Sequence, residues 1–177
     1  MSDLRAEIDD VFARYEAQWN SQDRGGLLAF WDDDGEQPFY LAEEQDDWIV
    51  GREGLSRYFV ANPGGPSFVE ALLMHYRLVD VRPLGPDHVQ AIGWVRHDMK
   101  LRAPRPAWGG DTRVTAVLHR TADGWRFVSY AEAHMTPLNY MQKLYEMNVT
   151  QEFKDFHAHL MAQEAAAATD ATSPVHP

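Results

Sequence analysis

The sequence has 177 residues, of which 45% are hydrophobic and 24% charged, and this composition is typical of one soluble globular domain rather than of a disordered or membrane protein. It contains no cysteine, which excludes disulfides, zinc–thiolate sites, iron–sulfur clusters and cysteine nucleophiles. The formal net charge of -11 opposes nucleic-acid binding, because neutralising phosphates requires a basic face.

The sequence carries no signal for insertion into a membrane. No apolar run approaches the roughly 20 residues that a spanning helix needs. The first residues, 1–5, are not followed by the apolar stretch of a signal peptide. We therefore expect a cytoplasmic protein without a membrane partner.

Helical periodicity dominates the N-terminal part of the chain. Over residues 4–19 apolar side chains recur every three or four positions, which predicts an amphipathic helix. These side chains are Leu4, Ile8, Val11, Phe12, Tyr15 and Trp19. After a turn at 20–23, a second short helix is expected over 27–31, and it ends in the acidic run 32–35.

A hairpin and a third helix are predicted next. The hairpin strands are 37–41 and 47–50, and an acidic turn joins them. Residues 51–61 have the apolar spacing of a helix, and the Pro- and Gly-rich run 62–66 ends it. The apolar side chains of this helix are Leu55, Tyr58 and Phe59.

The pattern then changes to long strands separated by turns rich in Gly, Pro and Asp-Gly. The strands are expected at about 68–81, 88–101, 112–121 and 125–135. Helices followed by a strand meander predict an α+β fold. A C-terminal helix is expected over 137–160, and 161–177 should form a flexible tail because it has nothing to bury. We thus predict one domain over residues 1–160.

Residues 11–33 and 123–128 carry two stretches that resemble segments of the SnoaL-like, nuclear-transport-factor-2-like superfamily. Residues 11–23 (VFARYEAQWNSQD) and 27–33 (LLAFWDD) resemble the opening of the ketosteroid isomerases without a gap. Residues 123–128 (DGWRFV) resemble the start of the last strand throughout the superfamily. Together with the order of the elements, the resemblance covers about residues 4–136.

The resemblance implies the fold of ketosteroid isomerase and scytalone dehydratase. In that fold a strongly curved, mixed or antiparallel sheet of about six strands forms a cone around three N-terminal helices, and the pocket lies at the mouth of the cone. The fold alone does not determine a function, because it hosts isomerases, dehydratases, cyclases, hydrolases and plain binding domains.

The strand at 88–101 has two different faces. Periodicity alone does not decide which of them is inward. One face carries Gln90, Ile92, Trp94, Arg96 and Asp98; the other carries Val89, Ala91, Gly93, Val95, His97 and Met99. By similarity to superfamily members with a basic residue in the pocket, we expect Trp94 and Arg96 to face the cavity.

On the last strand the same comparison sets the expected orientation. It points Val128, Tyr130, Glu132 and His134 inward, and Trp125, Phe127, Ser129, Ala131 and Ala133 outward. Glu132 and His134 are two residues apart, so their Cβ atoms lie about 6 to 7 Å apart and can share a proton network. With Arg96 they form the predicted catalytic group. Alternatively, Glu132 and Arg96 form a structural ion pair and His134 lies at a subunit interface.

Three more candidates follow from the resemblance. Tyr15 stands where ketosteroid isomerases keep their oxyanion-stabilising tyrosine, although its helical spacing equally suits a core residue. Glu43 and Glu44 lie in a segment resembling the one with the general base, where a solvated acidic hairpin is the alternative. We assign Glu44 to catalysis. Ala116 stands about where the isomerases have a second carboxylic acid, so a standard ketosteroid isomerase is not expected.

The 6 Trp, 7 Tyr and 8 Phe indicate a pocket for a small aromatic molecule. The residues expected to bind it are Trp19, Trp31, Tyr40, Glu43, Tyr58, Trp94 and Tyr130. No metal site is predicted, because neighbouring strand residues such as His97 and Asp98 point to opposite faces. No cofactor is predicted either, because the sequence has no phosphate-cradling glycine loop.

These residues predict a cofactor-independent lyase or isomerase that moves a proton and stabilises oxyanion charge. Residues 130–133 and 136–138 also resemble the SnoaL-like branch containing diarylpropane lyases, which deformylate lignin-derived aromatic dimers without a cofactor. Dehydration is a neighbouring activity. The alternative is a ligand-binding or oligomerisation domain without turnover. In either case we expect a homodimer or homotrimer, because the second face of the sheet needs cover.

Overall fold

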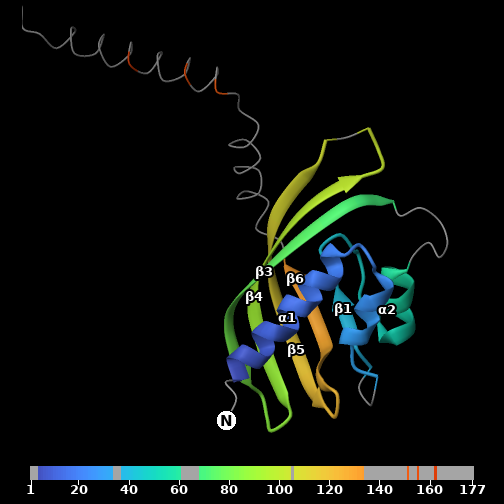
Figure 1. Cartoon of the computed structure of the whole chain (residues 1–177), viewed down its shortest axis with the longest axis vertical. Coiled ribbons are helices and arrows are strands. Elements are labelled where there is room, and N and C mark those ends of the chain that lie inside the picture. The colour runs from blue at the N-terminus through green and yellow to red at the C-terminus, as the bar shows by residue number, and fades with distance from the viewer. Residues whose placement is uncertain are drawn as a thin grey trace, which may run out of the picture. The chain divides into compact units, whose positions relative to one another are not determined.

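The computed structural model describes residues 4–33, 37–60, 68–104 and 106–133, and beyond them Gln151, Asp155 and Ala162. The elements are α1 (Leu4–Asn20), the 3-10 helix η1 (Gly25–Phe30), β1 (Phe39–Leu41), β2 (Ile49–Val50), α2 (Gly51–Phe59), β3 (Val69–Pro83), β4 (His88–Leu101), β5 (Trp108–Thr121) and β6 (Gly124–Ala133). The predicted α+β order is therefore confirmed (Figure 1). β5 begins at Trp108, earlier than the predicted start near residue 112.

The chain divides into two units, 1–134 and 135–177. In the second unit the three described residues are helical, and Gln151 Nε2 donates a hydrogen bond to Asp155 Oδ1 at 2.8 Å. The rest of the predicted C-terminal helix and tail lies outside the described residues.

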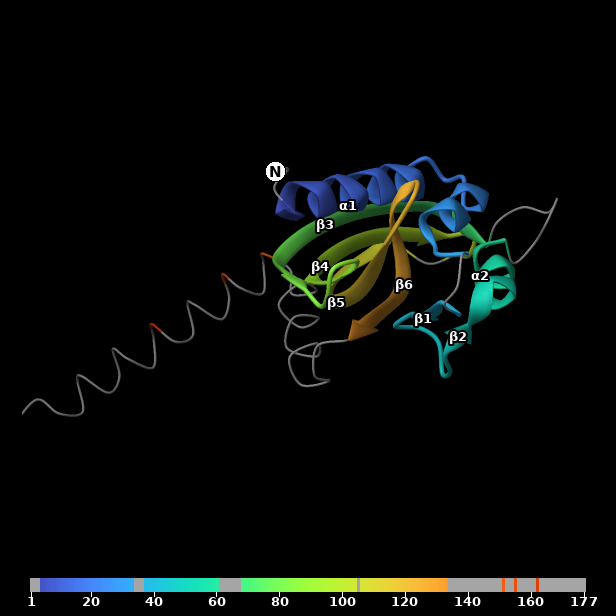
Figure 2. The same cartoon turned by 90° about the horizontal axis from the view of Figure 1, so that it is seen from below.

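The six strands form one mixed sheet in the order β2-β1-β6-β5-β4-β3. β1 pairs with β6 in parallel, and the other neighbours are antiparallel. The sheet is not closed, because β2 and β3 are edge strands. Figure 2 shows α1 lying across the concave side of the curved long strands, and α2 beside β1 and β2. This is the predicted cone of strands around the N-terminal helices.

The apolar face of α1 supplies the centre of the core. Its buried residues are Ile8, Val11, Phe12, Tyr15 and Trp19, as the three- and four-residue spacing predicted. The ring of Tyr15 lies 4.9 Å from that of Phe127 and 6.0 Å from that of Tyr76, measured between centroids. Each such side chain stabilises the fold by roughly 1.5 to 3 kcal/mol through burial. Among the described helices, none is long and apolar enough to cross a membrane.

Polar side chains at the end of α1 bind the backbone of β3. Asn20 Nδ2 donates to Met74 O at 2.9 Å, and Met74 N donates to Asn20 Oδ1 at 2.7 Å. Gln22 makes the same pair of bonds with Leu72, at 2.7 and 3.0 Å. Backbone groups of β3 that face away from β4 thereby find partners.

β6 carries a bulge that changes which side chains face the helices. Val117 pairs with Ser129, but the next pair is Leu118 with Phe127, which leaves Val128 as an extra residue. An extra residue shifts the alternation of side chains by one position. Residues before and after Val128 therefore follow different alternations.

The bulge corrects the orientation predicted for the first half of β6. Trp125 and Phe127 were expected to point outward, yet both are buried in the main core. Trp125 Nε1 donates to Glu7 Oε2 of α1 at 2.8 Å. Beyond the bulge, Tyr130 and Glu132 face inward as predicted. A strict alternation over the whole strand cannot place both pairs on the same side.

Candidate functional site

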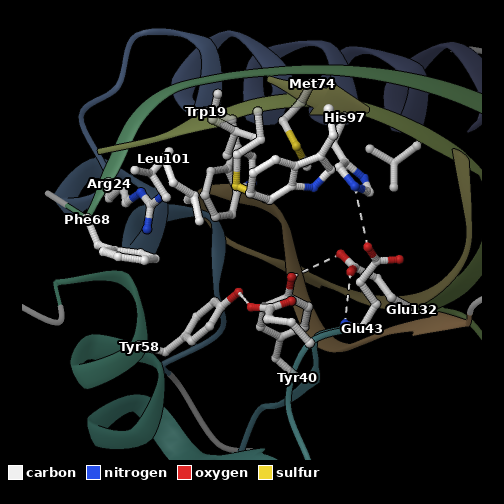
Figure 3. Close-up of a pocket in the computed structure, with 16 residues that line it drawn as sticks. Trp19, Arg24, Tyr40, Glu43, Tyr58, Phe68, Met74, His97, Leu101 and Glu132 are labelled. Atoms are coloured by element: carbon white, nitrogen blue, oxygen red, sulfur yellow. Dashed lines mark hydrogen bonds and ion pairs between the residues drawn. The ribbon is translucent and has the colours of Figure 1, made fainter. Parts of the chain in front are cut away.

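A cavity of about 420 Å³ lies beside the concave side of the sheet (Figure 3). It is lined by Trp19, Arg24, Tyr40, Glu43, Glu44, Tyr58, Phe68, Val69, Leu72, Met74, Val95, His97, Met99, Leu101, Trp108 and Glu132. Most of these side chains are apolar or aromatic. Its volume suits a small organic molecule, and its few polar groups suit the task of orienting that molecule.

Glu132 of β6 is a half-buried carboxyl group of the cavity. It accepts hydrogen bonds from Tyr40 Oη at 2.9 Å and from the backbone nitrogen of Glu43 at 3.2 Å. Burial, with the carboxylates of Glu43 and Glu44 nearby, raises the pKa of Glu132 to about 7, and the two hydrogen bonds only partly offset that rise. Glu132 can therefore both accept and donate a proton near neutral pH.

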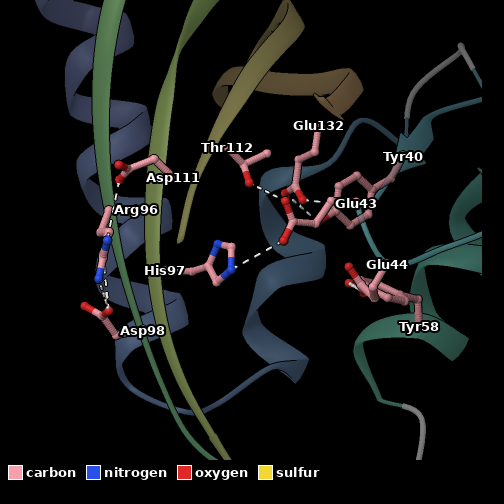
Figure 4. Close-up of polar contacts among 10 residues, drawn as sticks. All are labelled: Tyr40, Glu43, Glu44, Tyr58, Arg96, His97, Asp98, Asp111, Thr112 and Glu132. Carbon is pink, nitrogen blue, oxygen red and sulfur yellow. Dashed lines mark hydrogen bonds and ion pairs between the residues drawn. The ribbon is translucent and has the colours of Figure 1, made fainter. Parts of the chain in front are cut away.

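Glu43 joins the loop after β1 to the opposite wall of the cavity. Its Oε1 lies 3.4 Å from His97 Nε2 on β4, and its Oε2 accepts a short hydrogen bond from Thr112 Oγ1 on β5 (Figure 4). The side chains of Glu43 and His97 are only 19% and 14% exposed. The carboxylate of Glu43 thereby holds the imidazole ring of His97 at the wall of the cavity.

Glu44 points to the α2 side of the same cavity. Tyr58 Oη of α2 donates a hydrogen bond to Glu44 Oε1 at 2.6 Å. Burial and the adjacent carboxylate raise the pKa of Tyr58 well above its usual value. Three carboxyl groups, from Glu43, Glu44 and Glu132, thus line one cavity. The solvated hairpin considered as the alternative does not describe Glu43, which is half-buried, whereas Glu44 is exposed although it lines the cavity.

The two faces of β4 are reversed relative to the prediction. The fully buried side chains of this strand are Val89, Ala91 and Val95. Side chains alternate along a strand, so His97 lies on the same face as these residues and lines the cavity. Trp94 and Arg96 lie on the outer face. The predicted inward orientation of Trp94 and Arg96 is wrong: apolar residues determine which face is buried, and Trp94 and Arg96 lie on the other face.

Arg96 belongs to an ion-pair network on the outer face. Its Nη2 lies 2.7 Å from Asp98 Oδ1, and its Nη1 lies 3.9 Å from Asp111 Oδ1. Figure 4 shows this network on the side of β4 away from His97. Neither the predicted catalytic contact of Arg96 nor its alternative ion pair with Glu132 is formed.

Three predicted site residues lie in the core rather than along the cavity. Tyr15 and Trp31 are each 1% exposed, as is Tyr130, whose Oη donates to Tyr76 Oη at 3.0 Å. Burial raises the pKa of Tyr15 and of Tyr130 well above the usual tyrosine value. The core position considered as the alternative for Tyr15 is the one that the structure shows.

The other predicted residues meet at the cavity. They are Trp19, Tyr40, Glu43, Glu44, Tyr58 and Glu132. His134 lies outside the described residues, so its predicted role stays a prediction.

Sequence reasoning missed His97, Thr112 and Arg24 as polar groups of the site. For His97 a usable signal was present, since it follows the apolar alternation of Val89 to Val95 on one strand face. His97 pairs in register with Gly110 of β5. Thr112 and Arg24 carry no comparable pattern.

A second carboxyl–histidine pair lies apart from the cavity. Buried Asp32 has its Oδ2 2.7 Å from His119 Nδ1, and the ring of His119 stacks on that of His88 with centroids 4.7 Å apart. Within the described ranges, no group of three or more His, Asp or Glu side chains is placed to hold a metal ion. The Asp32 pair connects the segment after η1 to β5.

Comparison with known proteins identifies the fold. No protein-family model matches the chain, and no curated protein matches it. Among solved structures, a candidate scytalone dehydratase from Novosphingobium aromaticivorans has a TM-score of 0.64 at 11% identity, covering 75% of this chain and 84% of that one. A ketosteroid isomerase-like protein from Erwinia carotovora atroseptica has a TM-score of 0.61 at 16% identity, covering 77% and 100%.

A hexachlorocyclohexane dehydrochlorinase is also similar, with a TM-score of 0.59 at 19% identity, covering 73% of this chain and 83% of that one. These three structures share the fold of the SnoaL-like, nuclear-transport-factor-2-like superfamily, and this chain has the same fold. The predicted resemblance is thereby confirmed at the level of fold. The neighbours include a dehydratase, an isomerase-like protein and a dehydrochlorinase, so the fold supports catalysis by several reactions.

Proposed function

We propose, from the fold shared with those structures, that this protein is a cofactor-independent lyase or isomerase that uses acid–base chemistry on a small aromatic substrate. One observation carries the proposal. Glu132 is a half-buried carboxyl group with a pKa raised to about 7, and it faces a cavity whose walls are mainly aromatic and apolar. Carboxyl groups shifted toward neutral pH inside a cavity are typical of proton-transfer sites.

Glu132 acts in this proposal as the group that removes a proton from the substrate. Its Oε1 and Oε2 are held by Tyr40 Oη and by the backbone nitrogen of Glu43, so the carboxyl group has a fixed orientation. A base with a pKa near 7 is ionised in part of the molecules at neutral pH and is still basic enough to accept a proton.

His97 is the proposed second proton carrier. It comes from the opposite wall, and its Nε2 lies 3.4 Å from Glu43 Oε1. A protonated imidazole can donate to an oxygen on which negative charge develops while Glu132 takes a proton. Glu43 itself is held by Thr112, which makes it a positioning residue for His97.

The aromatic walls support an aryl substrate. Trp19, Tyr40 and Tyr58 present ring surfaces to the same space. Within this class, the resemblance of residues 130–133 to the diarylpropane lyase branch makes lignin-derived aromatic dimers the first compounds to test, for deformylation or dehydration.

The first test is a glutamine substitution of the proposed base. A panel of diarylpropane diols and aryl alcohols is incubated with the protein, and conversion is followed by ultraviolet absorbance and mass spectrometry. Glu132→Gln should lower turnover about 10² to 10⁴-fold while leaving binding intact, as removal of a general acid–base group does. Glu53→Gln is the matched control, because Glu53 lies 86% exposed on α2.

Full turnover by Glu132→Gln would show that Glu132 is not the base. If the wild type binds panel members but converts none, the result favours the alternative of a ligand-binding domain without turnover. The site would then serve recognition alone, and the carboxyl groups would orient the ligand.

A further inference from the structure

A cationic side chain lines the cavity without a part in the proposed proton transfer. Arg24 lies between α1 and η1 and is half-buried. Its guanidinium carbon lies 5.7 Å from the ring centroid of Trp19, so the cation rests over an aromatic face. Figure 3 shows Arg24 beside Phe68, at the end of the cavity away from His97 and Glu132.

Arg24 forms no ion pair with any described residue, unlike Arg96 on the outer face. The neighbouring carboxylate of Asp23 is occupied elsewhere, because it accepts from the backbone nitrogen of Gly25 at 3.1 Å and from Gln18 Nε2 at 3.3 Å. A guanidinium that has lost part of its water to an apolar cavity is stabilised by a bidentate anion. Within the described chain, no side chain supplies that anion.

The cavity is therefore polarised along its length. At one end Glu43 and Glu132 repel a negative charge, and at the other end Arg24 attracts one. A ligand with one carboxylate would bind in a single direction, with its charge at Arg24 and its uncharged end at Glu132. One negative charge suits this cavity better than a phosphate dianion, because three carboxyl groups line the same space.

We propose that Arg24 anchors a carboxylate of the ligand, so that the substrates of this site are aromatic carboxylic acids whose uncharged reacting end lies at Glu132. This inference rests on the proposed function, which assigns the reaction to the Glu132 end. Arg24 is thus a specificity-determining residue and does not itself transfer a proton.

The test measures binding alone, so that it does not depend on turnover. A series of ω-phenylalkanoates of increasing chain length and the matching uncharged ω-phenylalkanols are titrated by calorimetry. The wild type should bind the best acid more tightly than its alcohol, and Arg24→Gln should weaken binding of the acid about 10- to 100-fold while leaving the alcohol unchanged. Arg24→Lys should recover part of the loss, since it keeps the charge but not the planar fork.

The matched control is Arg57→Gln, because Arg57 is 75% exposed on α2 and does not line the cavity. It should bind acid and alcohol as the wild type does, and circular dichroism should show that Arg24→Gln is folded. The proposal is overturned if the wild type shows no preference for acids, whether both series bind equally or neither binds, or if Arg24→Gln and Arg57→Gln bind acids equally well.

The outcome separates this inference from the proposed function. Loss of turnover in Glu132→Gln together with unchanged acid binding in Arg24→Gln would retain the proton-transfer site and reject the carboxylate anchor. The reverse pair of results would retain the anchor in a protein that binds its ligand without converting it.

Discussion

The two faces of β4 carry charged residues that the protein uses in opposite ways. On the outer face Arg96 and Asp98 pair at 2.7 Å with side chains 42% and 49% exposed, so water screens their interaction. On the inner face, one residue away along the strand, His97 faces Glu43 where both side chains are largely shielded from water. Solvent exposure, more than residue type, therefore decides how strongly neighbouring groups act on a charged side chain.

The largest effect should come from the pH dependence of stability that the inner face imposes. The pKa of Glu132 is about 7 in the folded protein, against an ordinary value of 4.5. A raised folded pKa contributes stability that is complete below 4.5 and is lost as the pH rises through about 7. Relative to Glu132→Gln, the wild type should lose about 3 kcal/mol of unfolding free energy across this window.

Urea unfolding of both proteins at about pH 5 and about pH 8 measures that difference, because other titrating groups cancel between them. As the outer-face control, Arg96→Gln should follow the wild-type pH profile. Parallel profiles for the wild type and Glu132→Gln would mean that Glu132 titrates at an ordinary value, and the contrast between the two faces would then be weaker than we infer.

A smaller effect is expected on turnover from neighbouring substitutions on β4. His97→Gln should lower turnover of an identified substrate about 100-fold, because a proton carrier beside the substrate is lost. Arg96→Gln, one residue away, should change turnover by less than about 2-fold because its interactions are solvent-exposed. Steady-state kinetics of the two variants measure these changes. Equal losses of turnover in His97→Gln and Arg96→Gln would contradict the distinction between the two faces.

The smallest effect should be on stability at the outer face. Removing the Arg96 pairs with Asp98 and Asp111 by Arg96→Gln should change the unfolding free energy by less than about 1 kcal/mol, because all three side chains are exposed. Chemical denaturation at low and high salt measures the change. A loss of several kcal/mol that persists at high salt would show that these ion pairs contribute substantially to the stability of the fold.

Much of the fold was predictable because it follows from periodicity. The spacing of apolar residues in α1 and the alternation in β4 determine which elements form and nearly where they end. The bulge at Val128 was not predictable in the same way, because one extra residue leaves no mark in a sequence of mixed apolar side chains. It reversed the expected orientation of Trp125 and Phe127 while leaving that of Glu132 correct.

The site was predicted in part. Glu132 and Glu43 were found through the resemblance, whereas Tyr40 was named only as one of the residues expected to bind an aromatic molecule. Arg96 was assigned wrongly because a preference for polar residues in the pocket was set above the stronger tendency of apolar residues to be buried. His97 was missed for the same reason. Arg24 lies in the connection between α1 and η1, where no periodicity indicates which way a side chain points.

The hydrogen bonds from Asn20 and Gln22 to β3 affect whether another chain can pair with this edge of the sheet. An edge strand with free backbone groups is a template on which a foreign strand can add, and such growth leads to aggregation. Here the side-chain amides of Asn20 and Gln22 bond the backbone groups of Met74 and Leu72, as a neighbouring strand would do. At these positions the edge of β3 is therefore closed to sheet extension.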